Sequence, residues 1–158
     1  EEFNQNVFIN NHNVTEKIRT QEISSIVSSI ASIKEVREFL VKEQRKIGDK
    51  GGIVAEGRDI GSKVFPHAEL KIFLTATINE RANRRKNELE AMGNGTIDFE
   101  KLKDEIEQRD FEDSNRKISP LIKAKDAIEI ISDGYTVNQV VGKILEIYFE
   151  IIPKELHS

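Results

Sequence analysis

The fold is decided by Gly52-Ile53-Val54-Ala55-Glu56-Gly57-Arg58-Asp59-Ile60-Gly61, a short apolar run that leads into a charged loop. Ile53 to Ala55 is short and rich in β-branched side chains, which predicts a strand buried on both faces of a parallel sheet. The loop after such a strand lies where open α/β sheets bind ligands. Gly57 lets the backbone approach a bound group, and Arg58 offers a fork of donors matched to phosphate oxygens. The alternative is a surface turn in which Arg58 pairs with a neighbouring acid.

Composition limits the class of protein. The 158 residues, 37% hydrophobic and 33% charged, amount to about one domain. No apolar run approaches the length of a membrane span and the amino end does not resemble a signal peptide, so we expect a soluble cytoplasmic protein without a membrane partner. A net charge of -4 argues against nucleic-acid binding. Cysteine is absent and the three histidines are scattered, so we predict no protein metal site.

The amino-terminal third of the chain predicts a hairpin followed by two helices. Residues 6–14 form the hairpin, with Asn10-Asn11 at its turn. Thr20 caps a first helix that runs to about Ala31. Ser32 to Glu35 has the pattern of a capping box and opens a second helix to about residue 47. In that helix we expect Val36, Phe39, Leu40 and Ile47 to face inward and Arg37 to lie toward an edge.

The rest of the chain alternates strands and helices. Strands are expected at Leu70 to Leu74 and Ala127 to Ile131, and helices after Thr77, around Phe99 and after Thr136. We expect the last helix, capped by Thr136 with Gln139, to bury Val140, Val141, Ile144, Leu145, Tyr148 and Phe149. Short apolar strands separated by helices imply an α/β layered fold with a largely parallel sheet, and the residues before 50 form a helical insert.

Two charged segments could bind an anion. The helix after Thr77 carries Arg81, Arg84 and Arg85, whose alternative role is a solvated face paired with nearby glutamates. Arg109 and Arg116 are two turns apart with Asp113 between them on the same face if the helix persists there. Pro120 favours an extended Ser119 and hence a loop. The alternative for this segment is an exposed ladder of salt bridges.

Six motifs in this order and spacing closely resemble the bacterial cytidylate (CMP) kinases. They are Ile18-Arg19-Thr20-Gln21-Glu22, Val36-Arg37-Glu38, Glu56-Gly57-Arg58-Asp59-Ile60-Gly61, Phe65-Pro66, Glu80-Arg81-Ala82 with Arg84-Arg85, and Arg109-Asp110 through Asp113, Arg116 and Ser119-Pro120-Leu121. The resemblance implies a P-loop kinase-like three-layer α/β fold. It makes residues 1–50 a CMP-binding insert and residues 51–158 the carboxyl part of the core, with a lid at about 94–121. It also implies transfer of the γ-phosphoryl of ATP to CMP or dCMP, with Mg²⁺ accompanying ATP.

The resemblance also implies roles for individual residues. Those that would bind CMP are Ser28, Arg37, Arg58, Asp59, Arg109, Asp113 and Arg116. Ser28, Arg37 and Asp59 would read the cytosine edge, and Arg58 would hold the CMP phosphate. Arg109 and Arg116 are the implied catalytic residues on the lid, with Asp113 beside them, and Arg81, Arg84 and Arg85 would lie on the ATP side. Glu56 stands where this family often has an aspartate.

One motif of the family is absent. No Gly-rich loop of the type Gly-x-x-Gly-x-Gly-Lys-[Gly/Ser]-Thr occurs, and Lys50-Gly51 lacks its spacing. We therefore expect a preceding part of the same protein to supply this loop, and residues 1–158 alone to be inactive. In the family the missing strand lies between the strands that match Ile53 to Ala55 and Leu70 to Leu74, so its absence would leave two unpaired edges.

Two other functions remain open. One is a non-catalytic module, derived from such a kinase, that binds a nucleotide or a partner. The retention of Arg37, Arg58, Asp59, Asp113 and the lid arginines argues against it, because an unused pocket has no reason to keep them. The other is a kinase for a different monophosphate such as UMP, although Arg37 with Asp59 favours cytosine.

Overall fold

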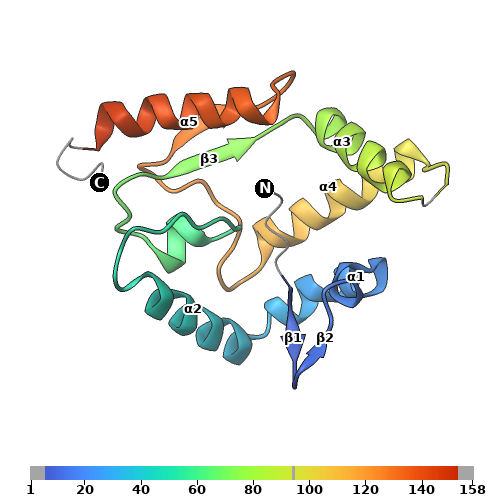
Figure 1. Cartoon of the computed structure of the whole chain (residues 1–158), viewed down its shortest axis with the longest axis horizontal. Helices are drawn as coiled ribbons and strands as arrows, with labels where there is room; N and C mark the ends of the chain where they lie inside the picture. Colours follow the sequence, from blue (N-terminus) through green and yellow to red (C-terminus); the bar gives the residue numbers. More distant parts are fainter. Residues whose placement is uncertain (1–5, 94, 153–158) are drawn as a thin grey trace.

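Two groups of elements make up the fold in the computed structural model, which describes residues 6–93 and 95–152. Figure 1 shows β3 (Ile72–Thr75), β4 (Ile128–Ile131) and α5 (Val137–Ile151) at one side of the molecule. The hairpin of β1 (Phe8–Ile9) and β2 (His12–Asn13) lies at the other side, with α1 (Gln21–Ala31) and α2 (Lys34–Gly48). Between them lies the short π-helix η2 (Ile60–Val64). The remaining elements are η1 (Lys17–Arg19), α3 (Ile78–Ala91) and α4 (Phe99–Asn115).

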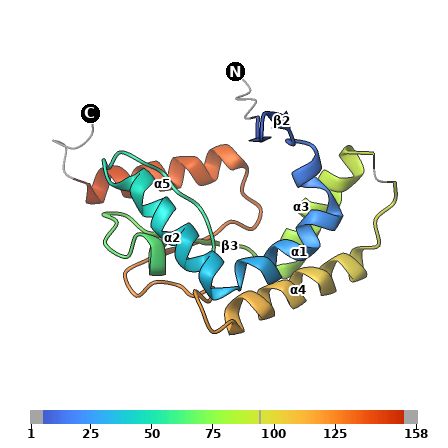
Figure 2. The same ribbon diagram turned by 90° about the horizontal axis from the view of Figure 1, so that it is seen from below.

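The central sheet is parallel, as the sequence predicts, and has two strands within the described residues. β3 pairs with β4 in a register that matches Ile72 with Ile128 and Thr75 with Ile131. The connection between them contains α3 and α4, which pack against each other and run side by side in Figure 2. Helices joined to a parallel sheet define a mixed α/β fold. Within the described residues, no helix has the length and apolar character needed to cross a membrane.

The predicted hairpin and first helix are confirmed. Asn10 and Asn11 have φ of 48° and 65°, the left-handed conformation that a tight hairpin turn requires. The Thr20 hydroxyl accepts the amide of Ile23 at 3.4 Å, so Thr20 caps α1.

The predicted capping box of the second helix is wrong. Ile33 occupies the N-cap of α2 and makes no side-chain cap, while the Ser32 hydroxyl donates to the Ser29 carbonyl at 2.7 Å. Ser32 therefore helps to end α1 instead of starting α2. A serine hydroxyl can satisfy either helix end, and here it bonds the carbonyl within the preceding turn.

The inward face of α2 also differs from the prediction. Arg37 and Val41 are buried, whereas Phe39, Leu40 and Ile47 are exposed. The reason is that η2 packs against α2, and Arg45 donates to the carbonyls of Val64 at 2.9 Å and Lys63 at 2.7 Å. Because of this contact, α2 turns the face with Arg37, Val41 and Arg45 toward η2. This face contains two arginines, so it is not the most apolar face of the helix.

The strand expected at Ile53 to Ala55 is not formed. These residues lie outside any helix or strand, Ile53 is 42% exposed and Val54 is fully exposed. An isolated strand has no ladder partner for its backbone amides, and no described strand pairs with this segment. The loop that follows is nevertheless ordered, because η2 begins directly after Asp59.

The caps of the later helices agree with the sequence. The Thr77 hydroxyl accepts the Glu80 amide at 3.3 Å, and Thr136 and Gln139 form the predicted capping box. Asp133 also accepts the Thr77 amide at 3.0 Å. Hydrogen bonds from Thr77 to the Asp133 carboxylate hold the pKa of this group below its ordinary value. These bonds join the residues that follow β3 and β4.

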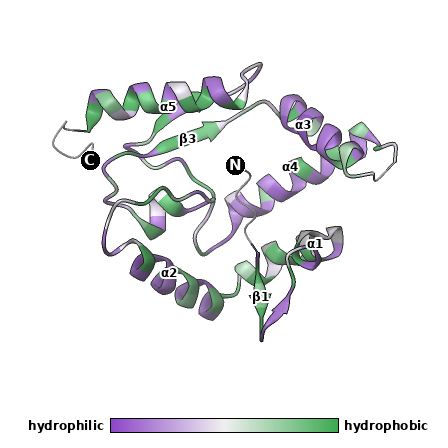
Figure 3. Cartoon of the chain, viewed as in Figure 1, coloured by the Kyte–Doolittle hydropathy of each residue, from purple (hydrophilic) through white to green (hydrophobic). Residues whose placement is uncertain are grey.

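The predicted burial of the last helix is wrong. No residue of α5 is buried, and Val141, Leu145 and Phe149 are about half exposed. In Figure 3 the ribbon of α5 carries hydrophobic residues along its length, interleaved with hydrophilic ones, and Leu74 and Ile131 of the sheet are exposed as well. A two-stranded sheet offers too little surface to cover such a face, since each buried leucine or phenylalanine needs many apolar neighbours.

We expect the 158-residue polypeptide alone to unfold over a broad temperature range and to bind a hydrophobic dye, because its α5 face and the segment around Val54 are exposed. Circular dichroism and dye fluorescence measure the two properties. The control is the same polypeptide extended by the preceding segment that the resemblance implies, which should unfold more sharply. A sharp, cooperative transition of the monomeric 158-residue chain would contradict this prediction.

Candidate active site

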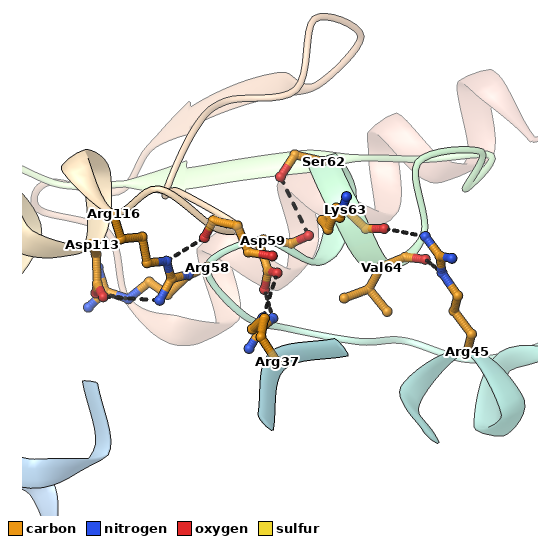
Figure 4. A network of polar contacts seen from close by, with 10 residues as sticks. Arg37, Arg45, Arg58, Asp59, Ser62, Lys63, Val64, Asp113 and Arg116 are labelled. Atoms are coloured by element: carbon orange, nitrogen blue, oxygen red, sulfur yellow. Dashed lines mark hydrogen bonds and ion pairs between the residues drawn. The ribbon is translucent and has the colours of Figure 1, made fainter. Parts of the chain in front are cut away.

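Arginines and aspartates from α3, from α4 with its C-cap and from the loop before η2 form one cluster. Asp110 on α4 accepts from Arg58 Nη1 through Oδ1 at 2.9 Å and forms an ion pair with Arg81 of α3 through Oδ2. Asp113, one turn later, pairs with Arg58 Nε at 3.3 Å and with Arg116 Nη1 at 3.4 Å. We call these five residues the arginine–aspartate cluster, and Figure 4 shows Arg58, Asp113 and Arg116 within it.

The cluster keeps a positive charge and free donors. Its three arginines and two aspartates leave a formal charge of +1. Each guanidinium has five N–H donors, and the ion pairs use one of Arg81's and two of Arg58's. Arg58 and Arg81 each expose 36% of their side chains, so both can reach a ligand. Planar donors around a net positive charge suit the oxygens of a phosphate.

Asp110 is ionised through its partners. Partial burial opposes the charged form, but the hydrogen bonds and charges of Arg58 and Arg81 outweigh burial and hold the pKa of Asp110 below its ordinary value. A depressed pKa means that the ion pairs contribute their stability above the ordinary aspartate range and lose it as the pH falls through the folded-state value. Asp110 is therefore ionised at neutral pH.

A buried ion pair lies directly beside the cluster. Arg37 of α2 is 8% exposed and Asp59 is 3% exposed, and Arg37 Nε donates to Asp59 Oδ2 at 3.1 Å. Arg37 Nη2 donates to the other carboxylate oxygen (Figure 4). The expected edge position of Arg37 is thus wrong, because Asp59 draws its guanidinium into the interior. Each carboxylate oxygen retains a second lone pair that can accept another donor.

The loop after α4 is shaped by the cluster. Arg116 Nε donates to the Ser119 carbonyl, and the Leu121 amide donates to the Asp113 carbonyl at 2.7 Å. Ser119 has φ of 51°, so the extended conformation predicted from Pro120 is wrong. The Arg116 hydrogen bond fixes the Ser119 carbonyl and prevails over the local preference of a residue before proline.

A basic cavity flanks these residues without containing the cluster. Its volume is about 540 Å³, and its walls include Arg37, Val41, Arg45, Lys63 and Ser119. Neither Arg58 nor Asp59 is among its lining residues. Most of its lining residues belong to α2, so the cavity lies along this helix.

Other predicted site residues lie outside the cluster. Arg109 is exposed and forms no ion pair with any residue that the structure describes. Arg84 donates to the Ser132 carbonyl at 2.6 Å and pairs with Glu80 at 2.8 Å, and Arg85 pairs with Glu88 at 2.7 Å. The ion pairs of Arg84 and Arg85 with glutamates of the same helix agree with the alternative role predicted for them, a solvated face of paired charges. Ser28 belongs to α1, and its side chain is outside those described.

Sequence reasoning did not single out Asp110 as a site residue. It was noted only as the neighbour of Arg109, yet Asp110 rather than Arg109 enters the cluster. The available signal was its spacing: Asp110 and Asp113 are three residues apart, so they share one face of α4. Two acids on one helical face, next to arginines of other elements, favour an internal ion network.

Arginines clustered in a mixed α/β fold form an arrangement whose donors suit the oxygens of a phosphorylated ligand. The pattern of the cytidylate kinase family matches residues 1–150, and the chain belongs to this family of nucleotide kinases. This confirms the resemblance found in the sequence. Among the described residues, no group of three or more His, Cys, Asp or Glu side chains could hold a metal ion.

The chain is also similar to curated bifunctional proteins. It is 69% identical over 151 residues to "Bifunctional pantoate ligase/cytidylate kinase" of Prochlorococcus marinus (strain AS9601), an alignment that covers 96% of the chain and 30% of the relative. It is 54% identical over 142 residues to the protein of the same name from Synechocystis sp., which covers 90% of the chain and 28% of the relative. The chain spans less than a third of the length of these relatives.

We expect Asp59→Asn to lower the free energy of unfolding of the full-length protein by about 3 kcal/mol, because it leaves the Arg37 guanidinium buried without its counter-charge. The matched control is Glu38→Gln, which removes the exposed partner of Lys34 on the same helix and should cost less than about 1 kcal/mol. Urea denaturation measures both changes. Equal losses of unfolding free energy in the two variants would show that the buried pair stabilises the protein no more than the exposed pair does.

Proposed function

We propose that the full-length protein transfers the γ-phosphoryl of ATP to CMP or dCMP and produces CDP or dCDP. The observation that carries this proposal is the position of two consecutive residues. Arg58 bonds Asp110 and Asp113 of α4, whereas Asp59 bonds Arg37 of α2. Because Arg58 and Asp59 point toward different helices, they can contact the two ends of one nucleotide. Its phosphate would then lie toward α4 and its base toward α2. Membership of the cytidylate kinase family supports the same substrate.

Cytosine recognition is assigned to the buried pair. Asp59 accepts from Arg37 and still has lone pairs for the amino group of cytosine. Arg37 uses Nε and Nη2 on Asp59, so three N–H donors remain that can face the acceptor atoms of the base. Ser28 on α1 would contribute a hydroxyl to the same edge. Within this proposal residues 1–50 form the CMP-binding insert.

Phosphate binding is assigned to the arginines. Phosphoryl transfer requires positioning and cations on the developing charge more than covalent help. Arg58 holds the CMP phosphate in this proposal, and Arg116, oriented by Asp113, is a second clamp. Arg109, exposed on α4, is the cation that moves with the lid at about 94–121. Of the candidates for the ATP side, Arg81 has a buried Nε with no partner among the described residues, whereas Arg84 and Arg85 are engaged with neighbouring side chains.

ATP binding requires more than residues 51–158 of the core. We assign the Gly-rich phosphate loop to the preceding part of the same protein, together with a strand beside Ile53 to Ala55. The exposure of Val54 and of the α5 face supports a missing neighbour there. Mg²⁺ accompanies ATP in this proposal, and we assign it no ligand among the described residues. Because ATP and CMP are metabolites of the cytoplasm, we place the reaction there.

The full-length protein should form CDP from CMP and dCDP from dCMP with ATP and Mg²⁺, whereas the 158-residue chain alone should form neither, because nothing in it cradles the ATP phosphates. Separation of the nucleotides after reaction measures both products, using protein free of host kinases. Binding of CMP by the full-length protein without turnover would indicate the non-catalytic module instead. Turnover by the 158-residue chain would refute the assignment of the phosphate loop.

Asp59→Asn should reduce kcat/KM for CMP by roughly tenfold to a hundredfold and should reduce it less for UMP, because an amide can donate to uracil O4. Arg58→Ala should reduce kcat/KM for both substrates about equally, since it acts on the phosphate that they share. The measurement is made at fixed ATP and Mg²⁺ on variants whose circular dichroism is unchanged. If Asp59→Asn left the preference for CMP intact and Arg58→Ala altered it, the assigned roles would be reversed.

A further inference from the structure

Asp110 is the one carboxylate of the cluster that contacts both the loop before η2 and α3. Its Oδ1 accepts from Arg58 at 2.9 Å, and its Oδ2 pairs with Arg81. Asp113 also contacts Arg58, but its other partner is Arg116, three residues away on the same segment. Within the described residues, the ion pairs therefore run in the order Arg81, Asp110, Arg58, Asp113 and Arg116.

The division of the two Asp110 oxygens limits how the arginines can move. If Arg58 turns toward a ligand, Asp110 must follow it or lose a bond, and either change alters the group that holds Arg81. Without the carboxylate, the two guanidinium groups would face each other as like charges at short range. Asp110 is only partly exposed and its pKa is lowered, so the charge that keeps them together is permanent at neutral pH.

We infer that Asp110 is a positioning residue that couples the arginine of the CMP phosphate, Arg58, to the arginine of the ATP side, Arg81. This inference rests on the proposed function, which assigns those two roles. It predicts that a change on the ATP side alters the affinity for CMP through Asp110, although Arg81 does not itself contact CMP. A carboxylate that merely packs α4 against α3 would transmit no such effect.

The test is a cycle of variants in the full-length protein, with the dissociation constant of CMP measured by calorimetry without ATP. Arg81→Ala should weaken CMP binding about fivefold, because Arg58 loses the partner that orients Asp110. Asp110→Asn should weaken binding about tenfold, since an amide offers one acceptor and no charge to two arginines. The double variant should bind CMP no more weakly than Asp110→Asn alone. Asp110→Glu, which keeps the charge, should recover part of the affinity.

Controls distinguish coupling from loss of structure. Lys86→Ala removes another cation of α3, which pairs with Glu90, and should leave the CMP affinity unchanged. If Asp110→Asn does not fold, Arg81→Ala and Asp110→Glu still decide the question. An unchanged CMP affinity in Arg81→Ala, or a double variant whose loss is the product of the single losses, would overturn the inference.

The readout also separates this inference from the proposed function. An unmodified protein that binds CMP but does not phosphorylate it would refute the proposed reaction while the binding cycle still tests the link through Asp110. An unmodified protein that does not bind CMP would overturn both.

Discussion

The ion pair between Arg37 and Asp59 is the constraint on which the arrangement of the site depends. Removing water from two charges is costly, and a buried pair is tolerated only when its geometry and hydrogen bonds are good. Arg37 meets this condition with two donors on the two carboxylate oxygens. The pair fixes α2 against the start of η2, so the backbone at Asp59 has little freedom. Arg58, the preceding residue, is thereby directed to α4 and to the arginine–aspartate cluster.

Local signals in the sequence predicted a large part of the fold. The turn at Asn10-Asn11, the caps Thr20 and Thr136, and the strands that became β3 and β4 depend on residues close together in the chain. Hydrogen bonds between residues three or four positions apart form the same cap or turn in most surroundings, so the local sequence pattern is enough to predict them. The pairing of Arg58 with an acid was also foreseen as an alternative, although with a neighbour in sequence and not with Asp110 and Asp113.

What the sequence could not predict depends on partners that are distant in the chain. Ile53 to Ala55 has the composition of a buried strand, but a strand exists only beside another one. The apolar residues along one face of α5 are typical of a helix that packs on a core. Whether they are buried depends on how much sheet lies next to the helix. Ser119 follows the hydrogen bond of Arg116 and not its own preference. Burial of Arg37 could not be read from periodicity, because a counter-charge draws it inward against the hydrophobic pattern.

The register of the sheet has a consequence for how the protein is made. Ile72 pairs with Ile128, more than fifty residues later in the chain, and a parallel pair cannot form until the helices between its strands have been synthesised. On the ribosome the hairpin, α1 and α2 emerge before the sheet, and β3 leaves the exit tunnel well before β4. Until β4 appears, the apolar strand Ile72–Thr75 lacks the one partner that it has among the described residues, so its open backbone groups expose the nascent polypeptide to aggregation during this interval of translation.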